Sequence, residues 1–190
     1  MFIDLVTLKK NILNFNALET LPSLFFQGSP NLNCISLQFH HITELPSTLF
    51  MHLIYLEELT LSHNLLDEIP SIKGLKNLQL LDLSDNLLKE LPQCVQDLPK
   101  LNELYLDENA LGAQADKLFQ HNPLINDCEV EIYPQKNKQK IKADLHRKKQ
   151  SIKKRQNAPS SNKEVRNHPL CQRDEWYVYN SDLLFLPFCI

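Results

Sequence analysis

The chain has 190 residues, a formal net charge of -3, 43% apolar and 23% charged residues, with 11 Pro and 3 Gly. This composition excludes a collagen-like or wholly disordered chain. The sequence contains no run of 18 or more apolar residues, so it predicts no membrane-spanning helix. Five Cys without a CxxC pair, and the lack of a basic-then-apolar leader, predict a reduced protein of the cytoplasm or nucleus without a secretory signal.

Charge is unevenly distributed along the chain. Residues 1–125 carry 15 acidic and 7 basic side chains, whereas residues 126–190 carry 8 acidic and 13 basic ones. We therefore divide the chain into a predicted repeat array at 1–133, a basic low-complexity linker at 134–168 and an apolar, aromatic C-terminal segment at 169–190.

A repeat of 22–24 residues runs through the first part, with copies starting near residues 8, 32, 56, 78 and 101. Its pattern is LxxLxLxxNxLxxLP, and Leu or Ile fills 23 of the 25 apolar slots, the exceptions being Asn11 and Gln114. The alternating LxL unit predicts a short strand, and stacked copies predict a parallel sheet over one continuous core. The Asn, replaced by His40 in the second repeat, can hydrogen-bond the turning backbone.

The Leu-Pro at the end of the repeat predicts a 3₁₀ or extended return rather than a long helix, because Pro fixes φ and lacks an N–H donor. The same prolines, and the lack of a sustained 3-4 spacing of leucines, exclude a long coiled coil. Beyond the last full repeat, Ala113 to Gln120 predicts a short helix and Leu124 to Tyr133 a last strand. Together they form a predicted closing unit at 112–133.

Residues 8–111 resemble a leucine-rich repeat array of the intracellular LxxLP type found in Scribble-like and Ras-suppressor-like proteins. The resemblance implies an α/β solenoid with a parallel sheet on its concave face. It also implies non-catalytic recognition of another protein on that face, as in an adaptor or scaffold of intracellular signalling. It identifies no individual protein.

If the LxL leucines point inward, the intervening positions face outward on the concave sheet. Phe15 and Phe39 then lie in adjacent repeats, and exposed aromatic side chains on a rigid sheet are favoured binding anchors. Acidic positions dominate the later repeats, which favours a partner with a basic surface. The alternative is a merely solvated polar face. The predicted partner-binding residues are Phe15, Phe39, Glu58, Asp82, Asp85, Glu103, Tyr105, Asp107 and Glu108.

The sequence contains no motif for catalysis. Three scattered glycines cannot form a phosphate loop, and no HExxH or paired Cys/His spacing is present. We therefore expect no enzyme, no cofactor and no metal site, and a monomer.

Residues 136–155 hold ten basic residues and one acid, Asp144. We expect a largely disordered C-terminal extension, because apolar residues are few, although the spacing of Ile141, Leu145 and Ile152 permits a marginal helix. The alternative function is binding of nucleic acid or an anionic membrane through this segment, with Lys148, Lys149, Lys153, Lys154 and Arg155 as the basic contacts. A solvated linker, or a tail that lies in cis on the acidic concave face, are further interpretations that the sequence leaves open.

Overall fold

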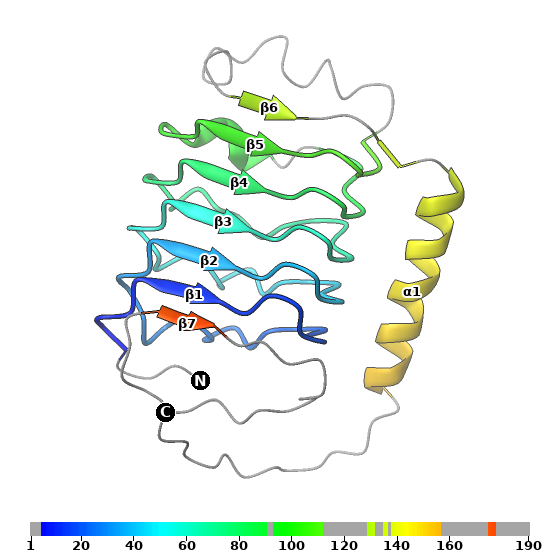
Figure 1. Ribbon diagram of the computed structural model, residues 1–190, viewed down its shortest axis with the longest axis horizontal. Coiled ribbons are helices and arrows are strands. Elements are labelled where there is room, and N and C mark those ends of the chain that lie inside the picture. The colour runs from blue at the N-terminus through cyan, green and yellow to red at the C-terminus, as the bar shows by residue number, and fades with distance from the viewer. Residues whose placement is uncertain are drawn as a thin grey trace.

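Short parallel strands, one from each predicted repeat, stack into a single sheet. The computed structural model describes residues 5–90, 93–111, 129–131, 135–136, 138–156 and 175–177. The predicted repeats contribute, in chain order, β1 (Lys10–Ile12), β2 (Cys34–Ser36), β3 (Glu58–Thr60), β4 (Leu80–Asp82) and β5 (Glu103–Tyr105). Each pairs in parallel with the next, so that the strands lie one above another (Figure 1). The predicted solenoid is confirmed.

Two further strands extend the sheet at its ends. β6 (Glu129–Glu131) pairs with β5 and falls within the predicted last strand. β7 (Glu175–Tyr177), from the C-terminal segment, pairs in parallel with β1, giving the order β6-β5-β4-β3-β2-β1-β7. The helix predicted at 113–120 lies outside the described residues.

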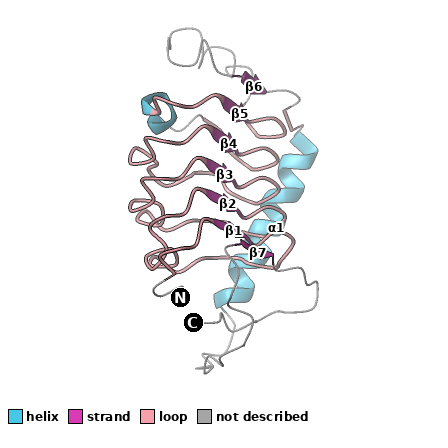
Figure 2. Cartoon of the chain, turned by 60° about the vertical axis from the view of Figure 1, so that its left-hand side comes forward, coloured by secondary structure: helices cyan, strands magenta, loops and turns pink. Residues whose placement is uncertain are grey.

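The core lies behind the sheet and follows the apolar slots of the repeat. The central residues Ile35, Leu59, Leu81 and Leu104 are aligned by the strand register and are completely buried. Burying one such side chain contributes about 1.5–3 kcal/mol to the stability of the fold. Because each of these side chains packs against the adjacent repeats, its burial stabilises those repeats as well. The chain returns on the opposite side of the core from the sheet (Figure 2).

The returns are short turns, as the Leu-Pro signal predicts. The N–H groups of Phe25 and Leu49 donate to the carbonyls of Pro22 and Pro46, closing one turn in each of the first two repeats. The fourth repeat returns through the 3₁₀ helix η1 (Gln93–Asp97). Phe25, Phe26 and Phe50 fill the wider space between returns and the sheet, all at most 2% exposed.

A ladder of buried Asn side chains holds the turn that follows each strand. In the fourth repeat, Asn86 Nδ2 donates to the carbonyls of Leu61 and Leu83 at 3.0 and 3.1 Å, while its Oδ1 accepts from the N–H of Leu66 at 3.0 Å. Asn64 and Asn109 make equivalent bonds. These amides satisfy backbone groups that would otherwise be buried without partners.

Gln135 continues this ladder into a sixth rung that the repeat pattern does not reveal. Its Nε2 donates to the Leu106 carbonyl and its Oε1 accepts from the N–H of Leu111, both at 3.0 Å. The residue stands four positions after the end of β6, as Asn109 stands four after β5. The solenoid geometry therefore continues beyond the fifth repeat.

The second rung is weaker. His40 is buried, and its Nδ1 lies 2.6 Å from the Asn16 carbonyl oxygen and 3.3 Å from the backbone nitrogen of Leu18. Its Nε2 has no hydrogen-bond partner among the described residues. Burial lowers the pKa of His40, against the opposing effect of backbone hydrogen bonds, and the ring is therefore neutral near pH 7.

Part of the basic segment forms the helix α1 (Lys138–Gln156). It is the marginal helix that Ile141, Leu145 and Ile152 allow, and it runs along the edge of the solenoid at which the strands end (Figure 1). Its direction opposes the order of the repeats, so that its first turns lie near β5 and its last turns near β1.

Candidate functional site

We define the sheet face as the surface formed by the first and third residues of β1 to β5. Burial confirms that the central residue of each strand points into the core, while Glu58, Asp82, Glu103 and Tyr105 retain solvent exposure. Tyr105 Oη donates to Glu103 Oε2 at 2.9 Å, and Asp82 Oδ1 accepts from the N–H and hydroxyl of Ser84. Asp82 and Glu103 are therefore held in defined positions on this face.

The residue preceding each ladder rung forms a second row at the edge of the sheet face. We call this row the edge column; in repeat order it consists of Phe15, Phe39, His63, Asp85 and Glu108. Each of these residues has a positive φ, between 48° and 58°. Non-glycine residues adopt this left-handed conformation at a cost, and here the tight turn into the Asn ladder imposes it at every repeat.

The first three members of the edge column form a continuous aromatic stack. The ring centroids of Phe15 and Phe39 are 4.3 Å apart, and those of Phe39 and His63 are 4.0 Å apart, with interplanar angles of 11° and 12°. Phe15 is 47% and Phe39 40% exposed. The structure thus brings together the two predicted aromatic contacts and adds His63, which occupies the same slot of its own repeat.

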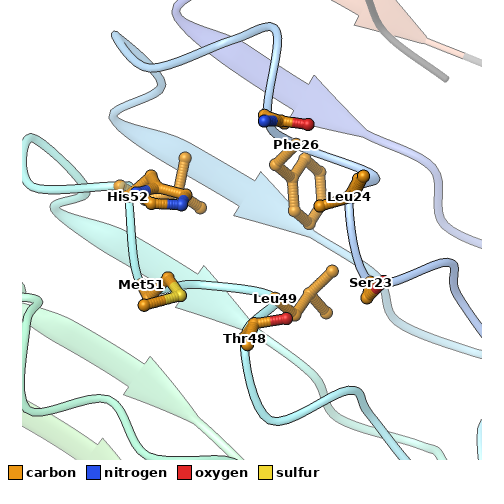
Figure 3. A pocket seen from close by; sticks show the side chains of 9 residues that line it. Ser23, Leu24, Phe26, Thr48, Leu49, Met51 and His52 are labelled. Carbon is orange, nitrogen blue, oxygen red and sulfur yellow. The ribbon is translucent and has the colours of Figure 1, made fainter.

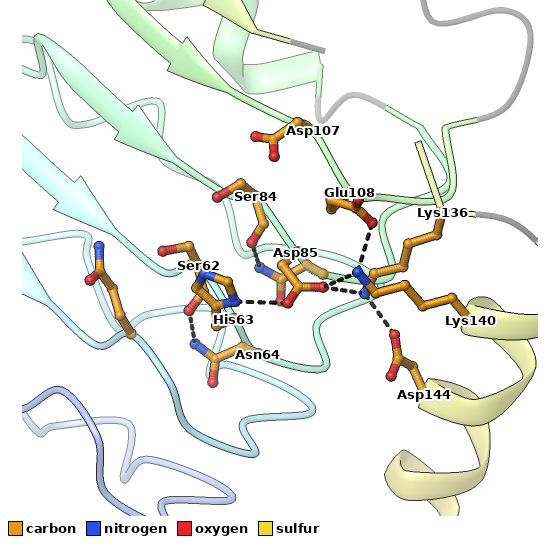
Figure 4. A network of polar contacts seen from close by, with 12 residues as sticks. Ser62, His63, Asn64, Ser84, Asp85, Asp107, Glu108, Lys136, Lys140 and Asp144 are labelled. Atoms are coloured by element: carbon orange, nitrogen blue, oxygen red, sulfur yellow. Dashed lines mark hydrogen bonds and ion pairs between the residues drawn. The ribbon is translucent and has the colours of Figure 1, made fainter. Parts of the chain in front are cut away.

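The stack continues into a chain of ionic contacts (Figure 4). His63 Nδ1 lies 2.7 Å from Asp85 Oδ2, and Asp85 Oδ1 lies 2.9 Å from Lys136 Nζ. Burial alone would raise the pKa of Asp85, but the hydrogen bond and charge of Lys136, together with His63 and Lys140, lower it below its ordinary value. Asp85 is therefore ionised near pH 7.

The last member, Glu108, pairs with Lys140 of α1. Lys140 Nζ lies 2.7 Å from Glu108 Oε2 and 3.7 Å from Asp85 Oδ1. The hydrogen bond to Glu108 raises the pKa of Lys140 against the opposing effect of burial, and the charges of Asp85, Glu108 and Asp144 raise it further. Two predicted partner contacts, Asp85 and Glu108, are thus engaged within the chain itself.

The most buried ion pair lies where α1 meets the solenoid. The side chain of Lys136 is 1% exposed and that of Asp144 is 4% exposed, and their charged atoms are 2.8 Å apart. The N–H of Lys136 also donates to the Asn109 carbonyl at 2.8 Å. Two charges removed from water in this way are stable only as partners, so the loss of one is costly.

Further basic side chains of α1 form ion pairs with the solenoid. Lys148 pairs with Asp67 of the third repeat. Arg155 contacts Glu19 and Glu44 of the first two repeats at 3.6 and 3.3 Å, and donates to Thr43 Oγ1 at 2.6 Å. We call Lys136, Lys140, Lys148 and Arg155 the docking cations. The predicted basic contacts thus divide: Lys148 and Arg155 face the solenoid, whereas Lys149, Lys153 and Lys154 are exposed.

A separate shallow pocket of about 140 Å³ lies on the returns of the first two repeats. Figure 3 shows Leu24 and Met51 among its lining side chains, and both are about half exposed. Within the described ranges, no group of three or more His, Cys, Asp or Glu side chains could hold a metal ion. No helix in the described part of the chain is both long and apolar enough to cross a membrane.

Comparisons with known proteins agree with the repeat architecture. Residues 56–111 match a leucine rich repeat family model. The solved structure of the leucine-rich repeat protein LIC12759 of Leptospira interrogans superposes with a TM-score of 0.61 at 35% identity, covering 67% of this chain and 32% of that one.

Curated relatives are similar over part of the chain. Fibromodulin of Sus scrofa is 35% identical over 95 residues, covering 49% of this chain and 63% of fibromodulin. The leucine-rich repeat and WD repeat-containing protein 1 of Xenopus tropicalis is 32% identical over 92 residues, 48% of this chain and 13% of that protein. The leucine-rich repeat serine/threonine-protein kinase 1 of Mus musculus is 35% identical over 124 residues, which cover 59% of this chain and 6% of the kinase. The chain thus matches only part of each relative's length.

Proposed function

We propose that this leucine-rich repeat protein is a non-catalytic protein-binding module, an adaptor or scaffold of the cytoplasm or nucleus, that holds its partner on the sheet face and the edge column. The observation that carries the proposal is the exposed stack of Phe15, Phe39 and His63. Two solvent-exposed phenylalanines on a rigid scaffold lose little conformational entropy on binding, which suits them as anchors.

The backbone of the stack supports the same interpretation. Each of its three residues sits at φ between 55° and 58°, a region in which β-carbon sterics disfavour large side chains. Asn, Asp or Gly would satisfy this turn more easily than Phe. Large aromatic rings at such positions add exposed apolar surface without filling the core, so we assign them to recognition.

The partner we propose carries an apolar side chain beside basic residues. The apolar group would lie against the aromatic stack, and the basic groups would approach Glu58, Asp82 and Glu103 across the sheet face. Asp85 and Glu108 contribute less while they are paired with the docking cations. Charge complementarity of this kind mainly accelerates association and selects partners, while the aromatic anchors supply affinity.

A selection of phage-displayed random linear peptides on the full-length protein tests the proposal. We expect enriched peptides to place an aromatic or aliphatic residue beside Lys or Arg, and to lose binding to the Phe15→Ser/Phe39→Ser variant. The matched control is Leu24→Ser/Met51→Ser, which removes two equally exposed apolar side chains from the pocket on the returns. Peptides that bind the first variant normally and fail on the control would refute the assignment.

A further inference from the structure

Helix α1 has a second charged face, directed away from the solenoid. Its exposed residues include five cations, which are spread over a little under half of the helix circumference, together with His146. We call this set the outward face; its cations are Lys142, Arg147, Lys149, Lys153 and Lys154. Arg147 pairs with Asp144 at 2.9 Å while its side chain remains 67% exposed. Among the described residues, no carboxylate pairs with the four lysines.

The spacing of these residues follows the helix period. Lys142, Lys149 and Lys153 are separated by seven and four positions, which places them on one side of an α-helix. Residues 142 to 154 span about 18 Å at 1.5 Å per residue. One strand of a nucleic-acid duplex carries about five phosphates over that length, at one per 3.4 Å. The three lysines on this side therefore lie along a length that carries about five phosphates, with Arg147 and Lys154 toward one flank.

The docking cations keep this face pointing outward. Lys140, Lys148 and Arg155 are held by carboxylates of the solenoid, and the helix's single acidic residue, Asp144, is buried against Lys136. Charge in α1 is therefore segregated: the cations that contact the solenoid are paired with its carboxylates, and, in the described part of the chain, the outward face carries four unpaired lysines and no exposed acidic residue. Such a surface repels itself, because Lys149 and Lys153 are one turn apart, and an anionic partner would relieve that repulsion.

We propose that the outward face binds the phosphate backbone of a nucleic-acid duplex without reading its sequence. A membrane is disfavoured because Ile141, Leu145 and Ile152 are partly buried, which leaves no large exposed apolar side chain on the described helix to insert into lipid. A single-stranded ligand is disfavoured because α1 contains no aromatic residue on which bases could stack. This activity goes beyond the proposed protein binding and does not depend on it.

Fluorescence anisotropy of the full-length protein with a labelled, mixed-sequence DNA duplex tests this inference. With three to five phosphate contacts, the logarithm of the binding constant should fall against the logarithm of salt concentration with a slope of about -3 to -5. The Lys149→Gln/Lys153→Gln variant should bind at least about tenfold more weakly in 100 mM salt, and its slope should be smaller in magnitude by about 2.

The matched control is Lys73→Gln/Lys76→Gln, which removes the same charge from exposed lysines of the solenoid and should leave the affinity unchanged. Equal binding of polyglutamate would overturn the inference by showing a general preference for anions. Binding of phosphatidylserine vesicles in place of the duplex would overturn it in favour of a membrane. An unaltered Lys149→Gln/Lys153→Gln variant, or no duplex binding at low salt, would also overturn it.

Discussion

Replacing Lys136 by Met should release helix α1 from the solenoid. The side chain is almost completely buried between Asp85 and Asp144, at 2.9 and 2.8 Å. Met preserves the length of the aliphatic chain and removes the charge. Among the described residues, Asp144 then retains Arg147 as its ion-pair partner, and Asp85 retains His63 and the more distant Lys140.

The expected cost follows from the burial of this pair. Removing one partner of a buried ion pair typically costs about 3–5 kcal/mol, because the remaining charge stays in a poorly solvated place. The other ion pairs of α1 are partly exposed, and exposed pairs each contribute about 0–1 kcal/mol. The loss is therefore comparable to what all of these pairs contribute together. An undocked helix of this composition is only marginally stable in water.

Hydrogen exchange measures the result directly. Amide protection over residues 138–156 should fall by roughly a hundredfold to a few thousandfold, while protection of β2 to β4 stays unchanged. Lys73→Met is the control, since Lys73 and its partner Asp97 are both exposed. Lys136→Met with Asp144→Leu should regain part of the protection, because the stranded charge is then gone. If Lys136→Met keeps the protection of α1 within a factor of about three, the buried pair does not hold the helix.

Three further outcomes are expected. Asn86→Ala should lower the free energy of unfolding in urea by about 1–3 kcal/mol, because the buried N–H of Leu66 loses its partner, while the Leu61 carbonyl still accepts from Asn64; partly exposed Asn77→Ala should change it by less than about 1 kcal/mol. Stability should decline in two steps as pH falls. The first begins below the ordinary His pKa of 6.5, because folding lowers the pKa of His40 and the unfolded chain takes up the proton first. The second begins below 3.8, where Asp85, whose pKa is also lowered by folding, stops contributing; His40→Asn should remove the first step alone in pH-dependent thermal melts. High salt should weaken the partly exposed contacts of Arg155 more than the buried pair of Lys136 and Asp144, so that exchange increases at the C-terminal end of α1 before its start.

The repeat array could be predicted from the sequence because the same residue types are required at fixed intervals along the chain. A strand of three residues must bury its central side chain, and Leu59 and Leu81 satisfy this in consecutive repeats. The Asn rungs were equally visible, since Asn64 and Asn86 stand at the same slot. The repeat pattern did not predict the role of Gln135, because the residue is not Asn and follows Asn109 by more than the 22–24 residues of one repeat. Its longer side-chain amide nevertheless makes the same hydrogen bonds.

Contacts made by α1 could not be read from the sequence. The spacing of Ile141, Leu145 and Ile152 indicates a helical face, but it does not indicate the surface on which that face packs. Arg155 pairs with Glu19 across most of the chain, and only the three-dimensional path of the solenoid brings them together. The edge column could be predicted only in part. Its position recurs in every repeat, but the stacking of His63 on Phe39 depends on a backbone conformation that the sequence does not show.

The pairing of β7 with β1 changes how the protein can be assembled. In a simple solenoid each repeat depends on its sequence neighbours alone, so the first repeats can fold while later ones are still being synthesised. Here the outer side of β1 receives its hydrogen-bonding strand from residues 175–177. Until those residues leave the ribosome, β1 presents an unpaired edge, and the buried Asn11 in its centre adds no apolar contact to protect it. β1 is therefore the first strand to be synthesised but one of the last to have both of its edges hydrogen-bonded.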